Sequence, residues 1–169
     1  MGTGKRKSES EGLTAHAVQR ALDAVADGGK AKELARFFKT EPGGYGEGDV
    51  FIGVKVPDQR VIAKRFAALP LDACEELLRS PVHEHRLTAL LIMVAQFEKA
   101  KGDEAQRTRD AIARRYLGNL DRVNNWDLVD SSAHFILGAS AFSQGKFLDE
   151  LRELARSDDL WRRRVAVIS

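Results

Sequence analysis

Apolar side chains recur with a helical period along nearly the whole chain. The first predicted helix, residues 13–26, would pack on its neighbours through a face of four apolar positions: Leu13, Ala17, Ala21 and Val25. Further helices are predicted over residues 31–39, 57–67, 71–80, 82–100, 104–117, 124–138 and 146–157, with a last one after Ser157. Nine predicted helices and no convincing strand indicate an all-α fold.

Residues 40–57 form the one long interruption of this pattern, with five glycines and two prolines. Within it, "VFIGVKV" has the composition of a strand, but a lone short strand would find no pairing partner in this chain. We therefore predict a loop packed by Phe51 and Ile52, followed by a helix that has Pro57 in its first turn.

Two distant segments of the chain are weakly similar. "EELLRSPVHEHRLTALLI" (75–92) resembles "RELARSDDLWRRRVAVI" (152–168), and the two segments start 77 residues apart. That spacing fits two helix pairs of roughly 40 residues each, which is the period of HEAT-type arrays. The pattern predicts a curved right-handed solenoid of antiparallel helix pairs, whose concave face would suit an elongated partner.

This helical repeat domain is predicted to cover residues 13–169, after a disordered polar tail over residues 1–12. The chain stops within a predicted helix, "RRRVAVIS", whose apolar side chains are unlike the polar outer face that ends an array. We therefore expect the C-terminal repeats to be missing from this sequence.

Composition restricts the functional classes. The longest apolar run, residues 87–95, is too short to span a membrane, and the N-terminus lacks the apolar core of a secretory signal. Cys74 is the single cysteine, which excludes internal disulfides and Cys-rich zinc sites and favours a reducing, cytoplasmic location. A net charge of +2 permits nucleic-acid binding only if the positive side chains cluster on one face.

The segment "NNWDLVD" (124–130) supplies the first candidate for chemistry. On a helical wheel, Asp130 lies at the edge of the apolar stripe that contains Trp126, whereas Asp127 points well away from it. A carboxylate held there could serve catalysis. It could equally form an ion pair or hydrogen bond, for example with His134 one turn later.

Arg164 is the second candidate, because it falls on the apolar face of the last predicted helix while Arg163 sits at its margin. Ser157 is the predicted N-cap of this helix. An arginine on an apolar face requires an anion, and the spacing leaves two open: a structural bridge to Asp130, or a bound phosphate.

Two further motifs are weaker. Tyr45 in "GGYGEGD" (43–49) could stack on a base or sugar, or could simply anchor its loop; the glycines lack the Gly-Lys-Ser/Thr of a P-loop. His83 and His85 in "HEHR" point to different helix faces, so we predict a solvated helix start rather than a metal site.

Four ordered segments, "YGEGDVFIGVKVP", "EHRLTALLIMV", "NNWDLVD" and "LWRRRVAVIS", resemble the AlkD-like family of DNA alkylation repair enzymes. These are HEAT-like repeat DNA glycosylases, and the resemblance covers roughly residues 13–169. It implies excision of N3- and N7-alkylated purines from duplex DNA by a monomer, without metal or other cofactor and without a membrane. The substrate would place the protein in the cytoplasm, on the nucleoid.

By motif, Asp130 resembles the family's catalytic Asp and Trp126 a Trp that lines its DNA groove. Arg164 resembles the groove Arg that contacts the DNA backbone, and we expect Tyr45, Trp161 and Arg163 to contact DNA beside it. An alkylated purine is cationic and leaves readily, so a carboxylate and an indole need only stabilise the oxocarbenium character of the sugar. The alternative from another class is a non-catalytic helical-repeat module that binds DNA or protein.

Overall fold

The computed structural model describes residues 12–169, so residues 1–11 of the predicted tail lie outside the described part. Across these residues the secondary structure is helical, and the one β-type feature is an isolated parallel bridge between Val50 and Val82. The all-α prediction is therefore confirmed. The chain divides into two compact units, Met1–Ile92 (unit 1) and Met93–Ser169 (unit 2), which we describe separately.

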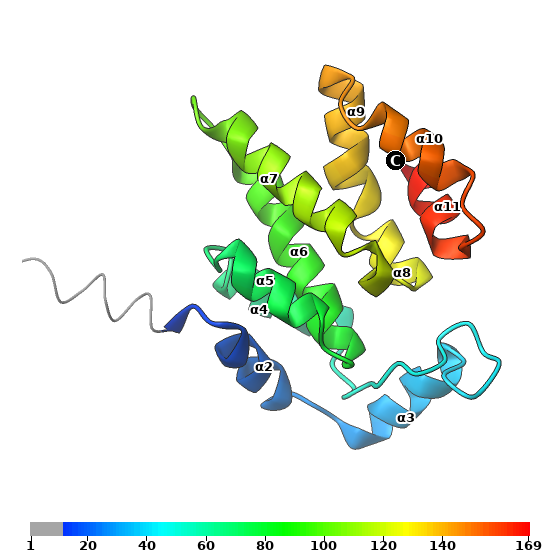
Figure 1. The fold of residues 1–169 in the computed structure, drawn as a ribbon. Helices are drawn as coiled ribbons and strands as arrows, with labels where there is room; N and C mark the ends of the chain where they lie inside the picture. The colour runs from blue at the N-terminus through cyan, green and yellow to red at the C-terminus, as the bar shows by residue number, and fades with distance from the viewer. Residues whose placement is uncertain (1–11) are drawn as a thin grey trace, which may run out of the picture. The chain divides into compact units, whose positions relative to one another are not determined.

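The described part of unit 1 contains four helices and the start of a fifth: α2 (Ala15–Asp23), α3 (Gly28–Phe37), α4 (Val56–Arg65), α5 (Leu71–Leu78) and α6 (His83–Lys99). Helix α2 packs on α4 and α5, as Figure 1 shows. Unit 2 contains α7 (Ala105–Gly118), the 3-10 turn η1 (Leu120–Arg122), α8 (Trp126–Asp130), the π-helix η2 (His134–Gly138), α9 (Ala139–Gln144), α10 (Leu148–Ala155) and α11 (Leu160–Ile168).

The buried face of α2 differs from the predicted one. The side chains that reach the core are Ala15, Val18 and Leu22, whereas Val25 is 49% exposed. Helical spacing identified an apolar face correctly but not the face that packs, because small alanines occur on both sides of this helix. The predicted face borders a groove, to which we return below.

The segment between α3 and α4 is a loop, as predicted. Phe51 is buried at 9% exposure and stacks between the rings of Phe38 and His83, with centroid distances of 4.9 and 4.6 Å. The loop backbone pairs with the residues before α6, since the Val50 nitrogen donates to the Pro81 carbonyl and His83 donates to Val50. Pro57 lies in the first turn of α4, again as predicted.

The "HEHR" motif is buried, so the prediction of a solvated helix start is wrong. Its four side chains are between 1% and 7% exposed. Glu84 accepts hydrogen bonds from three successive backbone N–H groups of the loop, those of Ile52, Gly53 and Val54. A carboxylate in this position satisfies donors that a buried loop would otherwise leave unpaired.

The rest of the motif forms a buried ion cluster with Asp49. The Asp49 carboxylate lies 2.9 Å from Nδ1 of His83 and 2.6 Å from the Arg86 guanidinium. Burial acts to raise the pKa of Asp49, but the hydrogen bond from His83 and the charge of Arg86 outweigh it and lower that pKa below its ordinary value. The cluster thus holds a charged carboxylate inside unit 1. Among residues 12–169, no group of three His, Cys, Asp or Glu side chains could hold a metal ion.

His85 predicts how unit 1 responds to acid. Burial lowers the pKa of its ring, Arg86 acts in the same direction, and Asp23 and Glu84 oppose them with smaller effects. Because the folded-state pKa lies below the unfolded one, folding favours the neutral ring. The stability from this site is therefore complete above about pH 6.5 and is lost as the pH falls below that value.

We accordingly expect His85→Gln to lose less stability than the unchanged protein between pH 7 and pH 5. The measurement is urea unfolding followed by far-ultraviolet circular dichroism, because both tryptophans belong to unit 2 and would not report on unit 1. His16, which is exposed on α2, provides the control. An equal pH response in His85→Gln and His16→Gln would contradict the assignment.

The helix predicted to end near Gly138 continues to Gln144, which corrects that boundary. Residues 134–138 form a π-helix, and the C-cap is Gly145 in a left-handed conformation with φ of 64°. Gly138 remains helical because its missing side chain leaves room for the end of α11: a Cβ there would lie 2.5 Å from the Ser169 carbonyl oxygen. Its glycine thus serves close packing rather than termination.

Candidate functional site

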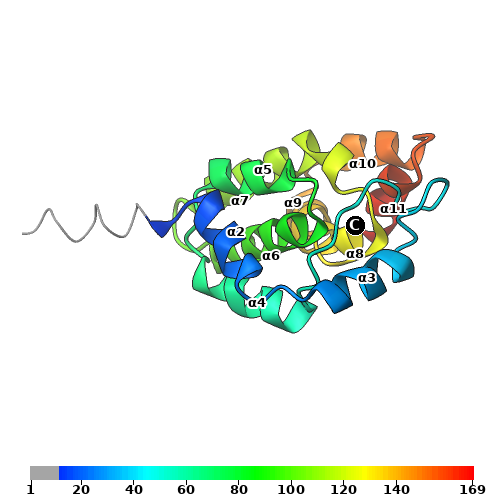
Figure 2. The ribbon, with the colours of Figure 1, turned by 90° about the horizontal axis from the view of Figure 1, so that it is seen from below.

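The candidate site lies in unit 2, where α8 and α11 pack against each other. Both views of the ribbon show these two helices side by side (Figures 1 and 2). The side chain of Asn125 accepts a hydrogen bond from the Trp126 backbone at the start of α8. α11 is capped by Asp159, which accepts from the N–H groups of Trp161 and Arg162, so the predicted cap at Ser157 is wrong. Asp159 fits better because its carboxylate also complements the positive end of the helix dipole.

Asp130 and Arg164 meet across these two helices. The Arg164 Nε donates to one carboxylate oxygen of Asp130 at 2.7 Å, and an Nη donates to the other at 2.6 Å. This is the bidentate geometry that makes an Arg–carboxylate pair directional as well as attractive. The hydrogen bond from Asp130 raises the pKa of Arg164 further, so the guanidinium stays charged.

Solvent reaches this ion pair. The side chains of Arg164 and Asp130 are 40% and 36% exposed, so the pair is not sealed in a core. Of the two partners that the spacing left open for Arg164, the structure shows Asp130. The exposure leaves the carboxylate and the guanidinium within reach of a ligand. His134, the other suggested partner of Asp130, instead lies against the ring of Phe135.

The remaining unit 2 residues of the predicted site surround the pair unequally. Trp126 and Trp161 are both half-buried, and each lies one helical turn before its charged neighbour, Asp130 or Arg164. Arg163 is exposed and donates to the Ser157 carbonyl at 2.8 Å, which fastens the turn before α11. The two indoles thus belong to the helices that bring the charges together.

Asp127, the other acid of "NNWDLVD", has a different environment. It is buried at 9% exposure, and its carboxylate accepts a hydrogen bond from the Leu128 backbone at 2.8 Å. Its role is therefore at the start of α8, and it offers little accessible surface to a ligand.

Tyr45 belongs to unit 1. Its hydroxyl donates to the Phe37 carbonyl at 3.1 Å, and the Lys39 ammonium lies 5.9 Å from the centre of its ring. These contacts fit the loop-anchor alternative, while the side chain is 37% exposed and retains an accessible face.

Sequence reasoning missed a buried support for α8. The Ser132 hydroxyl lies 3.0 Å from the Tyr116 hydroxyl and 2.6 Å from the Leu128 carbonyl. Burial raises the pKa of Tyr116, so this phenol stays protonated beneath the helix. Tyr116 is the only Tyr in the second half of the chain, but nothing in its spacing marks it as the partner of Ser132.

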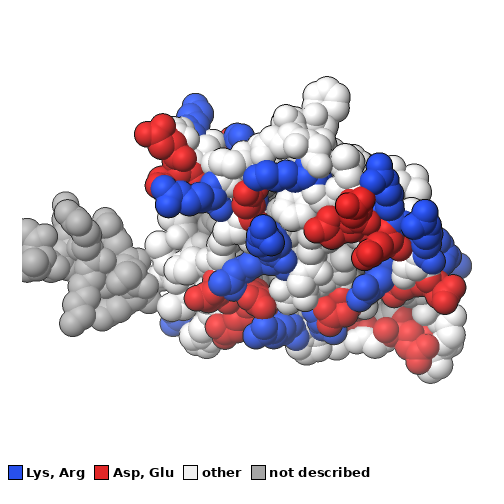
Figure 3. Space-filling model, turned by 45° about the horizontal axis from the view of Figure 1, so that its top comes forward, with Lys and Arg blue, Asp and Glu red and all other residues white. Residues whose placement is uncertain are grey.

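The charge pattern around the molecule is mixed. On the face shown in Figure 3, Lys and Arg side chains alternate with Asp and Glu and do not form one block. Within residues 12–169, no helix combines the length and apolarity needed to cross a membrane.

These features define an all-helical protein whose accessible ion-paired carboxylate stands one turn from a tryptophan. Comparison with known proteins gives the family. Residues 18–169 match the family model described as DNA alkylation repair enzyme, and the chain belongs to that family. The resemblance inferred from the sequence is thereby confirmed. No curated protein and no solved structure matches the chain.

Proposed function

We propose that this chain is a DNA glycosylase that excises cationic N3- and N7-alkylated purines from duplex DNA. Its membership of the DNA alkylation repair enzyme family supports a damaged-DNA substrate. The observation that carries the proposal is the solvent-accessible Asp130–Arg164 pair beside Trp126. It combines a carboxylate for a developing positive charge with a guanidinium for a phosphate.

The proposed chemistry asks little of the protein. Alkylation places a positive charge on the purine, so the base takes the electron pair of the breaking C1′–N bond and leaves neutral. The sugar becomes oxocarbenium-like, and water then adds to C1′ and releases a proton. Asp130 would stabilise that sugar charge electrostatically, and the face of Trp126 would add a cation–π attraction.

Arg164 would link DNA binding to this chemistry. In the free protein its guanidinium occupies both oxygens of Asp130. A DNA phosphate offers the same bidentate acceptor geometry and would compete for it, which would expose the carboxylate. Tyr45, Trp161 and Arg163 would make further DNA contacts. The protein would act as a monomer with its helix pairs arranged as a HEAT-like solenoid.

The test is release of 7-methylguanine from duplex DNA that carries this base at one position, measured by chromatography of the freed base. The proposal requires release well above that of the buffer alone. Undamaged duplex of the same sequence is the control, because a neutral guanine is a poor leaving group. Release that does not exceed the buffer rate would refute the activity.

The ion pair also favours a second candidate, a non-catalytic helical module that binds DNA. If Arg164 retains Asp130 when DNA is bound, the carboxylate is not available for chemistry. This candidate predicts DNA binding that weakens steeply with salt, without release of base.

A further inference from the structure

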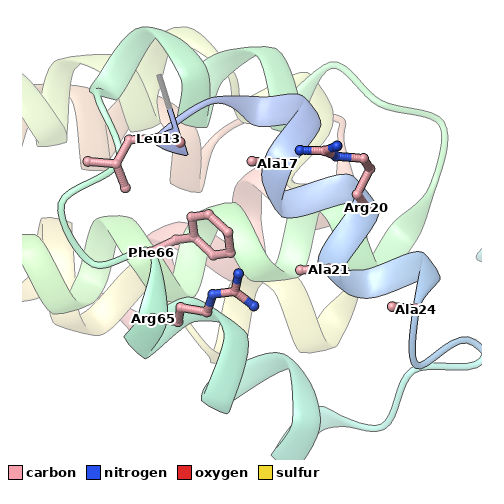
Figure 4. Close-up of a pocket in the computed structure, with 8 residues that line it drawn as sticks. Leu13, Ala17, Arg20, Ala21, Ala24, Arg65 and Phe66 are labelled. Carbon is pink, nitrogen blue, oxygen red and sulfur yellow. The ribbon is translucent and has the colours of Figure 1, made fainter. Parts of the chain in front are cut away.

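A second feature of the molecule, independent of the proposed glycosylase site, is a groove between α2 and the end of α4 in unit 1. Its volume is about 620 Å³, within the range of ligand sites. Ala17, Ala21 and Ala24 of α2 form one wall, and Phe66 closes the other side, with Arg20 and Arg65 beside them. Figure 4 shows the alanines facing the Phe66 ring across the open space. We call this the α2–α4 groove.

The apolar wall of the groove is an unused packing face. Helix α2 buries Ala15, Val18 and Leu22 against its own unit, whereas Ala17 and Ala21 are only half-buried and Ala24 is exposed. The small alanine side chains leave the α2 backbone accessible to a close neighbour. The helix is therefore amphipathic toward the core and has a second, narrower apolar strip that no described element covers.

The charge of the groove has one sign. Among the described residues that line it are two guanidiniums and no carboxylate. Arg65 lies 5.1 Å from the centre of the Phe66 ring, and within residues 12–169 neither Arg65 nor Arg20 has an acidic partner. In Figure 4 the Arg65 guanidinium points toward Ala21, and that of Arg20 runs along α2 toward Ala17. Both charges are thus directed along the apolar strip.

We propose that the α2–α4 groove binds an acidic peptide segment of a partner protein. The two arginines would pair with carboxylates of the segment, and an apolar side chain would lie between the alanines and Phe66. This combination suits a peptide better than a DNA backbone. Phosphates are recognised by many cations on a hydrated polar surface, whereas this groove offers two cations beside an apolar wall.

The test uses the full chain and a fluorescein-labelled peptide, Asp-Asp-Leu-Asp-Asp-Phe, with binding followed by fluorescence anisotropy. We expect Arg20→Ala and Arg65→Ala each to weaken binding about fivefold, as for a partly exposed ion pair. Replacing Leu and Phe of the peptide by Ser should weaken it at least as much. Arg60→Ala is the matched control, since Arg60 is an exposed arginine of α4 outside the groove lining and should bind the peptide unchanged.

Three results would overturn the proposal. An equal loss for Arg60→Ala would mean general charge attraction. Equal binding of the Ser-substituted peptide would mean that the apolar wall is not used. A loss of affinity for undamaged duplex DNA in the two groove variants, with no loss for the peptide, would assign the arginines to DNA. Base release in the glycosylase assay is a separate readout, and we expect Arg20→Ala and Arg65→Ala to leave it unchanged.

Discussion

Replacing Asp130 by Asn is expected to lower the rate of 7-methylguanine release about 100-fold, while duplex DNA still binds. An amide keeps the size of the side chain but removes the negative charge that would face the sugar. Loss of one preorganised electrostatic group in a catalytic site typically costs about this factor, or about 2.7 kcal/mol in activation free energy. The pair with Arg164 is partly exposed, so its loss should change stability by less than about 1 kcal/mol.

Asp127→Asn is the matched control for this experiment. Asp127 lies one turn earlier on the same helix, and an amide oxygen can still accept the hydrogen bond from Leu128. Single-turnover base release and a DNA-binding titration should be measured for both variants. Equal release by Asp130→Asn and the unchanged protein would remove Asp130 from the chemistry. Equal losses in both variants would point instead to damage of α8.

Gly53→Ala should destabilise the fold by about 4 kcal/mol, because it combines backbone strain with a steric clash. Gly53 has a φ of 84°, and a Cβ there would lie 2.0 Å from the Asp27 carbonyl oxygen and 2.7 Å from the Ala31 nitrogen. Backbone atoms at the start of α3 cannot move aside without disturbing the loop that Glu84 holds. Urea unfolding followed by circular dichroism measures the loss.

Gly48→Ala separates the two causes. Gly48 has the same φ of 84°, but a Cβ there meets nothing within 4 Å. It should therefore show only the cost of the left-handed backbone, about 1 kcal/mol. The difference between the two variants is the steric contribution, and equal losses would show that the contact with α3 yields freely.

The sequence predicted well what depends on local pattern. Periodicity and breakers located the helices and the long loop, and wheel geometry placed Asp130 at the edge of an apolar stripe. Pairing was harder, because Asp130 and Arg164 are 34 residues apart and two partners fitted the arginine equally well. Only the packing of α8 on α11 decides between them.

The errors have a common physical origin. "HEHR" looks polar, and nothing local indicates that a loop of more than a dozen residues would cover it and supply backbone donors to Glu84. Gly138 looks like a helix end, but the approach of Ser169 explains the glycine. Each error concerns a residue whose environment is built by a distant segment.

The π-helix at residues 134–138 fixes the length of the chain between the two members of the ion pair. Deleting a single residue there would restore α-helical winding and turn everything that follows by about 100° about the helix axis. α9, the turn at Gly145 and the α10–α11 pair would rotate together, and Arg164 would no longer face Asp130. Substitutions in this stretch can be absorbed by repacking, whereas a one-codon deletion cannot. We therefore expect relatives that retain the pair to differ here by exchange of residues and not by loss of one.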